Sequence, residues 1–126
     1  MAKHFRDLTC WQLARGLKKE VTQILKKPVF QRNLRSRDNL SDAASSVRRN
    51  IAEGFGRREH KEFARFLNIS LGSLKEVEDG LIECVDNEWV TQEEIADALR
   101  FCKRTTVATT RLRNSIKDKP DPPWCA

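Results

Sequence analysis

The chain has 126 residues, of which 33% are charged and 39% hydrophobic, with 5 glycines, 4 prolines and a net charge of +6. This length suits one domain, and the composition favours helices over sheets or disorder. Because no apolar run approaches the ~18 residues of a membrane span and no signal peptide is recognisable, a cytoplasmic protein without membrane contact is predicted.

The first predicted helix runs from about Arg6 to Lys27. Its apolar side chains recur at steps of three and four residues, which places them on one face. They are Leu8, Trp11, Ala14, Leu17, Val21 and Ile24. The opposite side carries Arg15, Lys19 and Lys26. Pro28 is expected to stop the helix. Residues 28–34 are predicted to form a loop, with Val29 and Phe30 against the bundle.

The second predicted helix spans about Leu34 to Phe55. Its apolar stripe consists of Leu40, Ala43, Ala44, Val47, Ile51 and Phe55. Gly54 and Gly56 mark its end, because either glycine can adopt the left-handed conformation of a C-cap.

The third predicted helix runs from near Arg58 to about Asn87. Its apolar face consists of Phe63, Phe66, Leu67, Leu71, Leu74, Leu81 and Val85. Gly72 lies in the middle of this helix, where a glycine costs about 1 kcal/mol relative to alanine. A glycine in such a place is interpreted as a packing device that lets another helix come close.

The fourth predicted helix starts at Thr91, which forms a capping box with Glu94. Its inner stripe consists of Ile95, Leu99, Cys102, Thr106, Thr109, Leu112 and Ile116. Four amphipathic helices with short connections predict an all-α fold, an antiparallel up-down-up-down four-helix bundle over residues 1–117. Residues 118–126 are predicted to form a Pro-rich C-terminal tail.

No constellation of residues indicates catalysis, a metal site or a cofactor. The four cysteines, Cys10, Cys84, Cys102 and Cys125, form no CxxC pair, and only two histidines are present. Zinc sites need four ligands at short paired spacings, so reduced cysteines, with Cys84 and Cys102 packed as small apolar groups, are predicted. The GFGR segment contains GxG, but a helix end explains both glycines. The chain is therefore not predicted to be an enzyme.

Charge is distributed unevenly along the chain. Residues 1–61 contain 15 Lys and Arg against 6 Asp and Glu, whereas residues 62–126 contain 9 against 12. Glu76 to Asp97 holds nine acidic residues and no Lys or Arg. A basic half indicates a polyanionic partner such as RNA or DNA. The alternative is that these charges only solvate long helices.

The predicted chain topology places many basic residues at one end of the bundle. In an antiparallel bundle, the start of the first helix, the second turn and the end of the fourth helix lie together. That end collects Lys3, Arg6, Arg57, Arg58, Lys61, Arg65, Arg111, Arg113 and Lys117. With the first-helix stripe and two arginines of the second helix, the candidate nucleic-acid-binding residues are Arg15, Lys19, Lys26, Arg48, Arg49, Arg57, Arg58, Lys61, Arg65, Arg111 and Arg113. No aromatic residues interleave with these charges, so sequence-specific reading is not expected. The competing interpretation is charge pairing with the acidic hairpin of a neighbouring subunit.

Three segments carry a resemblance to a known bacterial family. They are FRDLTCWQLA (Phe5 to Ala14), NIAEGFGR (Asn50 to Arg57) and EFARFLNISLGSLKE (Glu62 to Glu76). The chain resembles the four-helix bundle proteins found in intervening sequences of bacterial 23S ribosomal RNA genes. It is also similar to the accessory variability determinant of diversity-generating retroelements. The resemblance covers most of the chain through the third helix.

The resemblance implies a four-helix bundle that assembles into a homo-oligomeric ring, commonly a pentamer, without enzymatic activity. For the retroelement relative it implies nucleic-acid binding and association with a reverse transcriptase. The chain departs from the family pattern in the second helix. Asn39, Ser41 and Asp42 replace a Gln followed by two basic residues, while arginines occur at Arg48 and Arg49. The resemblance therefore does not carry a nucleic-acid surface over to that helix unchanged.

The motifs also contain residues to which we assign a structural role. They are Ser46, Asn50, Glu53, Gly54, Phe63, Phe66, Gly72 and Ser73. The polar members Ser46, Asn50, Glu53 and Ser73 are predicted to form hydrogen bonds at helix–helix contacts that fix register. A ligand site built from them is the alternative. Binding to generic nucleic acid would separate an RNA- or DNA-binding protein from a pure protein scaffold.

Overall fold

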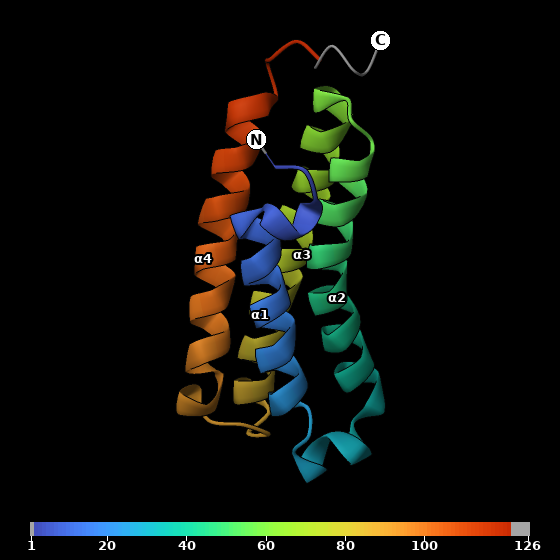
Figure 1. Ribbon diagram of the computed structural model, residues 1–126. Coiled ribbons are helices and arrows are strands. Elements are labelled where there is room, and N and C mark those ends of the chain that lie inside the picture. The colour runs from blue at the N-terminus through green and yellow to red at the C-terminus, as the bar shows by residue number, and fades with distance from the viewer. Residues whose placement is uncertain (1, 122–126) are drawn as a thin grey trace.

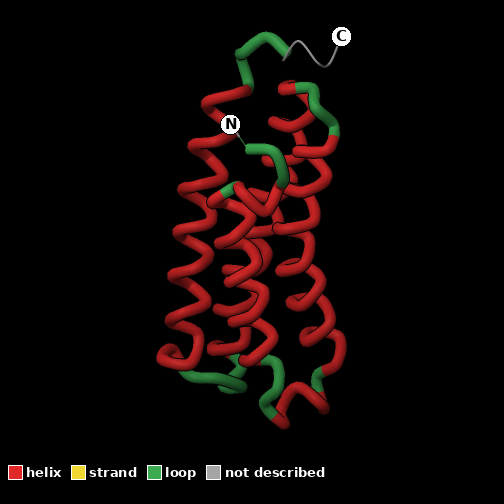
Figure 2. Tube along the Cα trace, in the orientation of Figure 1, coloured by secondary structure: helices red, strands yellow, loops and turns green. Residues whose placement is uncertain are grey.

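The computed structural model describes residues 2–121, which form four α-helices and two short 3-10 helices. The α-helices are α1 (Thr9–Ile24), α2 (Leu34–Gly56), α3 (His60–Asp86) and α4 (Gln92–Ile116). The 3-10 helices are η1 (Phe5–Asp7) and η2 (Pro28–Arg32). No strand occurs between residues 2 and 121, so the prediction of an all-α fold is confirmed (Figure 2).

The four helices pack side by side as a bundle (Figure 1). α1 packs against α2 and α4, and α3 packs against the same two helices, so the cross-section is a closed square. Figure 1 shows the α1–α2 and α3–α4 connections at one end, which we call the hairpin end. The α2–α3 connection lies at the opposite end together with the last turn of α4, and we call it the terminal end.

α1 is shorter than the sequence predicted at both ends. It starts at Thr9 because Leu8 is extended, with φ −76° and ψ 126°, and separates it from η1. A capping box on η1 fixes this geometry: the Arg6 N–H donates to His4 Nδ1 at 3.1 Å, and Asp7 accepts from the His4 N–H at 3.1 Å. The helix ends at Ile24, so Lys26 lies outside the helical stripe on which it was placed.

The segment 28–34 was predicted to be a loop but contains a 3-10 helix. Its Phe30 packs against the bundle, as predicted. Residues 28–32 form η2, which places Phe30 in the core at 0% exposure. The Phe30 ring meets Trp89 edge-on at a centroid distance of 6.0 Å. Next to it, Lys27 Nζ donates to the Trp89 carbonyl at 3.1 Å and to Glu94 at 2.9 Å. Glu94 also completes the predicted capping box with Thr91, which joins the two connections at the hairpin end.

α2 ends at Gly56, as predicted, but neither Gly54 nor Gly56 adopts the left-handed conformation expected of a C-cap. None of the glycines between residues 2 and 121 has a positive φ, whereas Arg58, with φ 69°, adopts the left-handed conformation after α2. Gly54 is buried inside α2, where a Cβ would lie 2.7 Å from Phe66 Cβ and 2.9 Å from Phe63 Cδ1. Its missing side chain therefore lets α3 approach α2 closely.

Gly72 was assigned the same packing role, and within one chain this assignment is wrong. A Cβ built at Gly72 meets nothing within 4 Å, and the residue is exposed on α3. The role of close contact belongs instead to Gly54, and to Gly16, where a Cβ would clash with the Phe101 ring.

The core combines aliphatic side chains with hydroxyl groups. Leu17, Ile51 and Leu67 are fully buried at its centre. On α4 the hydroxyl residues at full burial are Thr105 and Thr109, while the predicted Thr106 is only partly buried. Thr105 and Thr106 donate to carbonyls one turn back in α4, which satisfies their hydroxyl groups without a partner helix. The described part of the predicted tail, residues 118–121, is exposed, and residues 122–126 lie outside the described range.

Candidate nucleic-acid interface

The seam between α1 and α2 holds a lysine that the sequence did not single out. Lys18 Nζ donates to the Ser41 carbonyl at 3.0 Å and to Ser41 Oγ at 2.7 Å. Burial lowers the pKa of the Lys18 ammonium below its usual value. Asp42 acts against this shift, and the charges of Arg48 and Arg49 act with it. Arg48 and Arg49 of α2 are therefore near enough to Lys18 to interact with it electrostatically.

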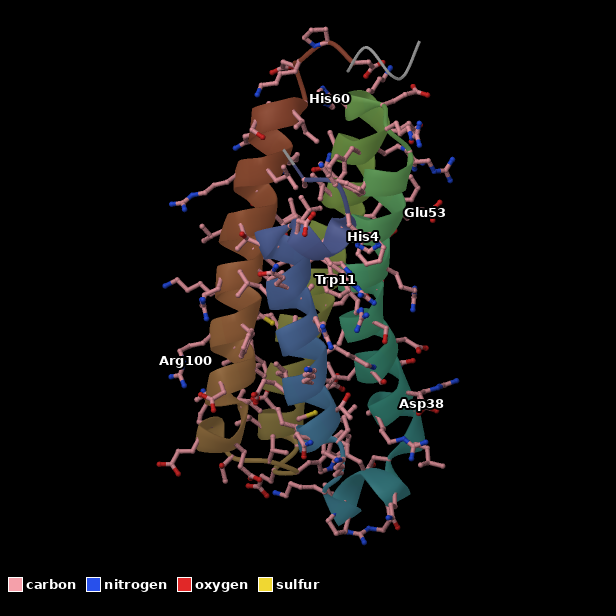
Figure 3. The ribbon with its side chains drawn as sticks, in the orientation of Figure 1. His4, Trp11, Asp38, Glu53, His60 and Arg100 are labelled. Carbon is pink, nitrogen blue, oxygen red and sulfur yellow. The ribbon has the colours of Figure 1, made fainter. Side chains whose placement is uncertain are left out.

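Trp11 fixes two arginines on the same seam. Its side chain is 4% exposed and lies between α1 and α2 (Figure 3). The guanidinium carbon of Arg48 lies 5.0 Å from the Trp11 ring centroid, and that of Arg15 lies 5.8 Å from it. Both distances are in the range of cation–π attraction, which holds an arginine in place while leaving its charge unneutralised.

These contacts define a surface that we call the α1–α2 basic face. Its residues are Arg15, Lys18, Lys19, Arg48 and Arg49. None of the five forms an ion pair with a carboxylate in the described part of the chain. Lys18 was missed because helical spacing alone placed Lys19 on the outer stripe. The available signal was that Lys18 follows Trp11 by seven residues, which puts both on the face toward α2.

The terminal end gathers the predicted arginines, but pairs several of them with carboxylates. Arg57 bonds to Glu53, and Arg65 bonds to Glu62, each at 2.9 Å. Both guanidinium groups also stack on Phe66, at 5.2 Å for Arg57 and 4.6 Å for Arg65. The charges of these two arginines are therefore balanced within the chain.

The other predicted basic residues are dispersed. Arg113 donates to Asn68 Oδ1 at 3.0 Å, which joins α4 to α3. Lys61 and Arg111 are exposed at the terminal end, as is Arg58 in the α2–α3 connection. Lys26 is exposed at the hairpin end, away from them (Figure 1). The structure thus brings Arg15 and Arg48 together on Trp11, with Lys18 and the charge of Arg49 nearby, and separates Lys26 from the arginines of the terminal end. Lys19 is exposed and directly follows Lys18 in α1.

Two of the four predicted polar residues, Ser46 and Ser73, form a hydrogen bond between helices, and Asn50 bonds to Ser46 within α2. Ser46 Oγ and Ser73 Oγ lie 2.8 Å apart, and Asn50 Nδ2 donates to the Ser46 carbonyl at 2.8 Å and to Ser46 Oγ at 2.9 Å. One turn away, Ser70 Oγ donates to the Val47 carbonyl at 2.9 Å. The Ser46–Ser73 and Ser70–Val47 bonds fix the register of α2 against α3. Glu53 is not part of the set, because it is exposed and pairs with Arg57.

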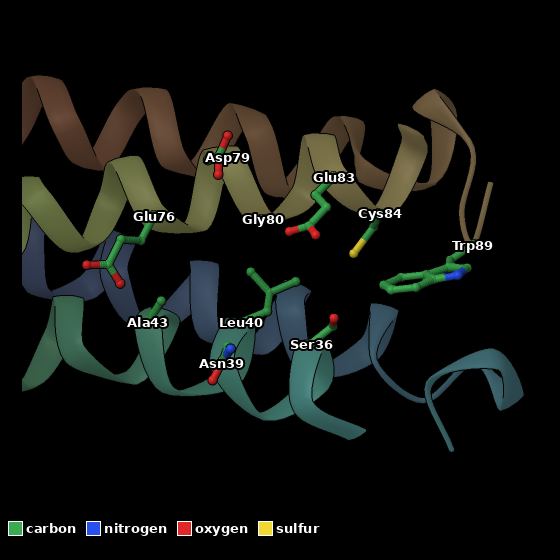
Figure 4. A pocket seen from close by; sticks show the side chains of 10 residues that line it. All are labelled: Ser36, Asn39, Leu40, Ala43, Glu76, Asp79, Gly80, Glu83, Cys84 and Trp89. Atoms are coloured by element: carbon green, nitrogen blue, oxygen red, sulfur yellow. The ribbon is translucent and has the colours of Figure 1, made fainter. Parts of the chain in front are cut away.

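A small groove lies between α2 and α3 toward the hairpin end (Figure 4). Its volume is about 170 Å³. Its walls include Leu40, Ala43 and Trp89, and its rim carries the carboxylates of Glu76, Asp79 and Glu83. The groove therefore carries negative charge, in contrast to the positive charge of the α1–α2 basic face. Over residues 2–121 no cluster of three potential metal ligands occurs, and no helix there is long and apolar enough to span a membrane.

The buried cysteines are expected to be chemically inert in the folded protein. Burial raises the pKa of Cys10 and Cys84 to about 11 and that of Cys102 to about 12. At pH 8 the thiolates of Cys10 and Cys84 are therefore roughly a hundredfold scarcer, and that of Cys102 roughly a thousandfold scarcer, than the thiolate of an exposed cysteine. Alkylation at pH 8, followed by mass spectrometry of the three peptides, should modify them only in denaturant. Modification of the native protein at the denatured rate would contradict this prediction. Cys125 lies outside the described residues.

Comparison with known proteins agrees with the fold and with the motifs. No curated protein matches the chain. The sequence model of the family described as 23S rRNA-intervening sequence protein matches residues 6–110, which include the polar motif and the α1–α2 basic face. This match extends over more than half of the 126 residues and over all three segments that carried the resemblance. The chain therefore belongs to the 23S rRNA-intervening sequence protein family.

Proposed function

We propose that the protein is a non-enzymatic, homo-oligomeric helical bundle that binds the phosphate backbone of RNA or DNA through the α1–α2 basic face. One observation carries this proposal. Three cationic side chains meet on the seam between α1 and α2, where Trp11 holds Arg15 and Arg48 and Ser41 holds Lys18, none of them through a carboxylate. Their charge remains available to an external anion.

The expected mode of binding is electrostatic. Lys and Arg that neutralise phosphates release condensed counterions, so affinity falls steeply as salt increases. Trp11, the aromatic ring that contacts Arg15 and Arg48, is buried beneath them and cannot stack on a base. Binding should therefore depend weakly on sequence.

The test uses a labelled RNA and a labelled DNA of arbitrary sequence, with fluorescence anisotropy as readout. Both nucleic acids should bind at low salt and dissociate as salt is raised. The proposal fails if neither binds at low salt, or if a single sequence binds and all others do not.

The assembly is proposed from the family resemblance, which implies a ring of five copies. The connections at alternate ends in Figure 1 support the up-down-up-down course that such bundles share. In a ring every α1–α2 basic face is repeated, so modest contacts with one nucleic acid would add through multivalency. Trp11, Phe30, Phe63 and Phe66 are already buried within one chain, so these four rings give no support to oligomerisation.

The assembly prediction is tested by sedimentation at micromolar concentration. A mass of five chains, or a multiple of five, is expected. A species of 14.6 kDa, the mass of one chain, would contradict homo-oligomerisation.

A protein scaffold is the second candidate function, and the acidic groove between α2 and α3 favours it. A basic segment of another protein would fit carboxylates above an apolar floor. The resemblance to the retroelement protein makes a reverse transcriptase one such partner. This candidate moves ahead if generic nucleic acid does not bind at low salt.

A further inference from the structure

The outer face of α3 carries charges in a symmetric order about Gly72. Lys61 and Arg65 precede this glycine by eleven and seven residues, and Asp79 and Glu83 follow it by seven and eleven. All five positions are exposed, and their spacings of four and seven residues place them on one side of the helix. The N-terminal half of this face is thus basic and the C-terminal half acidic.

Within one chain Arg65 pairs with Glu62 and stacks on Phe66, whereas Lys61, Asp79 and Glu83 form no ion pair in the described residues. The last turn of α3 contains no basic residue, so Glu83 and Asp86 lie at the negative end of the helix dipole, where acidic side chains are unfavourable. Gly72 weakens the helix and meets no other part of the chain. The same helix exposes 40% of Ile69 and 46% of Ile82, which flank the charged row on its two sides.

The acidic half of the face also has a place for a cationic side chain. The groove of about 170 Å³ opens beside it, and Glu76 and Glu83 point toward α2 across this groove (Figure 4). Leu40, Ala43 and Trp89 offer apolar contact for the aliphatic part of a lysine or arginine. Gly80 keeps α3 close to Leu40 here, because a Cβ would lie 3.0 Å from Leu40 Cδ1.

We propose that two copies of the chain pair through antiparallel α3 helices that cross at Gly72. In this register Arg65 of each copy meets Asp79 of the other, and Lys61 meets Glu83. The absence of a side chain at Gly72 lets the two backbones approach. Such a contact is isologous, because the same patch serves both copies.

This contact is distinct from the one that would close the proposed ring. A two-fold contact is satisfied by two copies, whereas a ring of five needs head-to-tail contacts through another surface. If both exist, the α3 contact joins two rings. The pairing also assigns Lys61 and Arg65 to self-association, which leaves nucleic acid to the α1–α2 basic face.

The test uses two charge reversals that improve the isolated helix. Lys61→Glu places an acid near the N-terminus of α3, and Glu83→Lys places a base in its last turn, so both should preserve or raise thermal stability. Each variant opposes like charges at both symmetric contacts. Self-association measured by sedimentation should weaken about tenfold or more, and the number of chains in the assembly should halve. Lys103→Glu, an exposed reversal on α4, is the control and should change neither quantity.

Complementation separates specific pairing from a general charge effect. The double variant Lys61→Glu/Glu83→Lys restores opposite charges at both contacts, and so does an equimolar mixture of the two single variants. Both samples should recover wild-type assembly. Gly72→Arg has open space in the chain and should fold, but it places two arginines against each other at the two-fold axis and should block pairing.

The outcomes distinguish this proposal from the ring. The pairing is supported if the wild-type mass corresponds to two or ten chains and halves in the single variants. A wild-type mass of two chains would support the pairing but overturn the ring. A mass that the single variants and Gly72→Arg leave unchanged overturns the pairing. Loss of assembly in the single variants without recovery in the double variant also overturns it.

Discussion

The double variant Arg15→Gln/Arg49→Gln is expected to bind nucleic acid roughly sixtyfold more weakly than wild type at about 0.1 M salt. Each substitution removes one phosphate contact, and the loss follows from the counterions that are no longer released. Arg15 belongs to α1 and Arg49 to α2, so the pair samples both sides of the α1–α2 basic face. Both side chains are exposed and neither forms an ion pair in the described chain, so the fold should be preserved. Affinity for one duplex of arbitrary sequence, measured by anisotropy, checks the prediction.

A matched control removes the same charge elsewhere. Lys103→Gln with Arg104→Gln takes two exposed cations from α4 and leaves the α1–α2 basic face intact. This variant should bind within about threefold of wild type, since it retains every proposed phosphate contact and alters only the long-range field. Equal losses in the two double variants would mean that net charge, rather than this face, determines binding.

Phe30→Ala is expected to lower the free energy of unfolding by about 3–5 kcal/mol, the cost of truncating a buried aromatic side chain. Phe30 is fully buried, packs on Trp89 and anchors the α1–α2 connection in the core. Urea unfolding followed by circular dichroism measures the change. Leu34→Ala, at a side chain with 49% exposure close by in the sequence, is the comparison and should stay within about 0.5 kcal/mol of wild type. Similar losses at both positions would contradict the packing of η2 described here.

Sequence patterns predicted the helices because each one buries a continuous stripe against the bundle. Leu17, Val47 and Leu67 lie on such stripes and are fully buried. The Thr91 cap was also predictable, since capping depends on residues only three positions apart. Helix ends were less predictable. The start of α1 depends on the His4–Asp7 capping box and an extended Leu8, whose effects are local, small and masked by a continuous apolar pattern.

The sequence could not predict the roles of residues that depend on contacts between helices. Gly54 and Gly72 are both helix glycines in the family motifs, yet only Gly54 faces another helix of the chain. Arg15 and Arg48 were both predicted as candidate nucleic-acid-binding residues, but the sequence did not show that they share a surface, which they do because both stack on Trp11. Lys18 could not be separated from Lys19 without knowing that Ser41 of α2 lies beside it. Spacing along one helix gives a face, but the neighbour on that face comes from the tertiary structure.

The salt dependence of binding tests the α1–α2 basic face most directly. The logarithm of the association constant for duplex DNA is plotted against the logarithm of salt concentration for wild type and for Arg15→Gln/Arg49→Gln. Each lost phosphate contact should reduce the magnitude of the slope by about 0.9, so a decrease of about 1.8 is predicted. An unchanged slope in the double variant, or a wild-type protein that does not bind at low salt, would contradict the account.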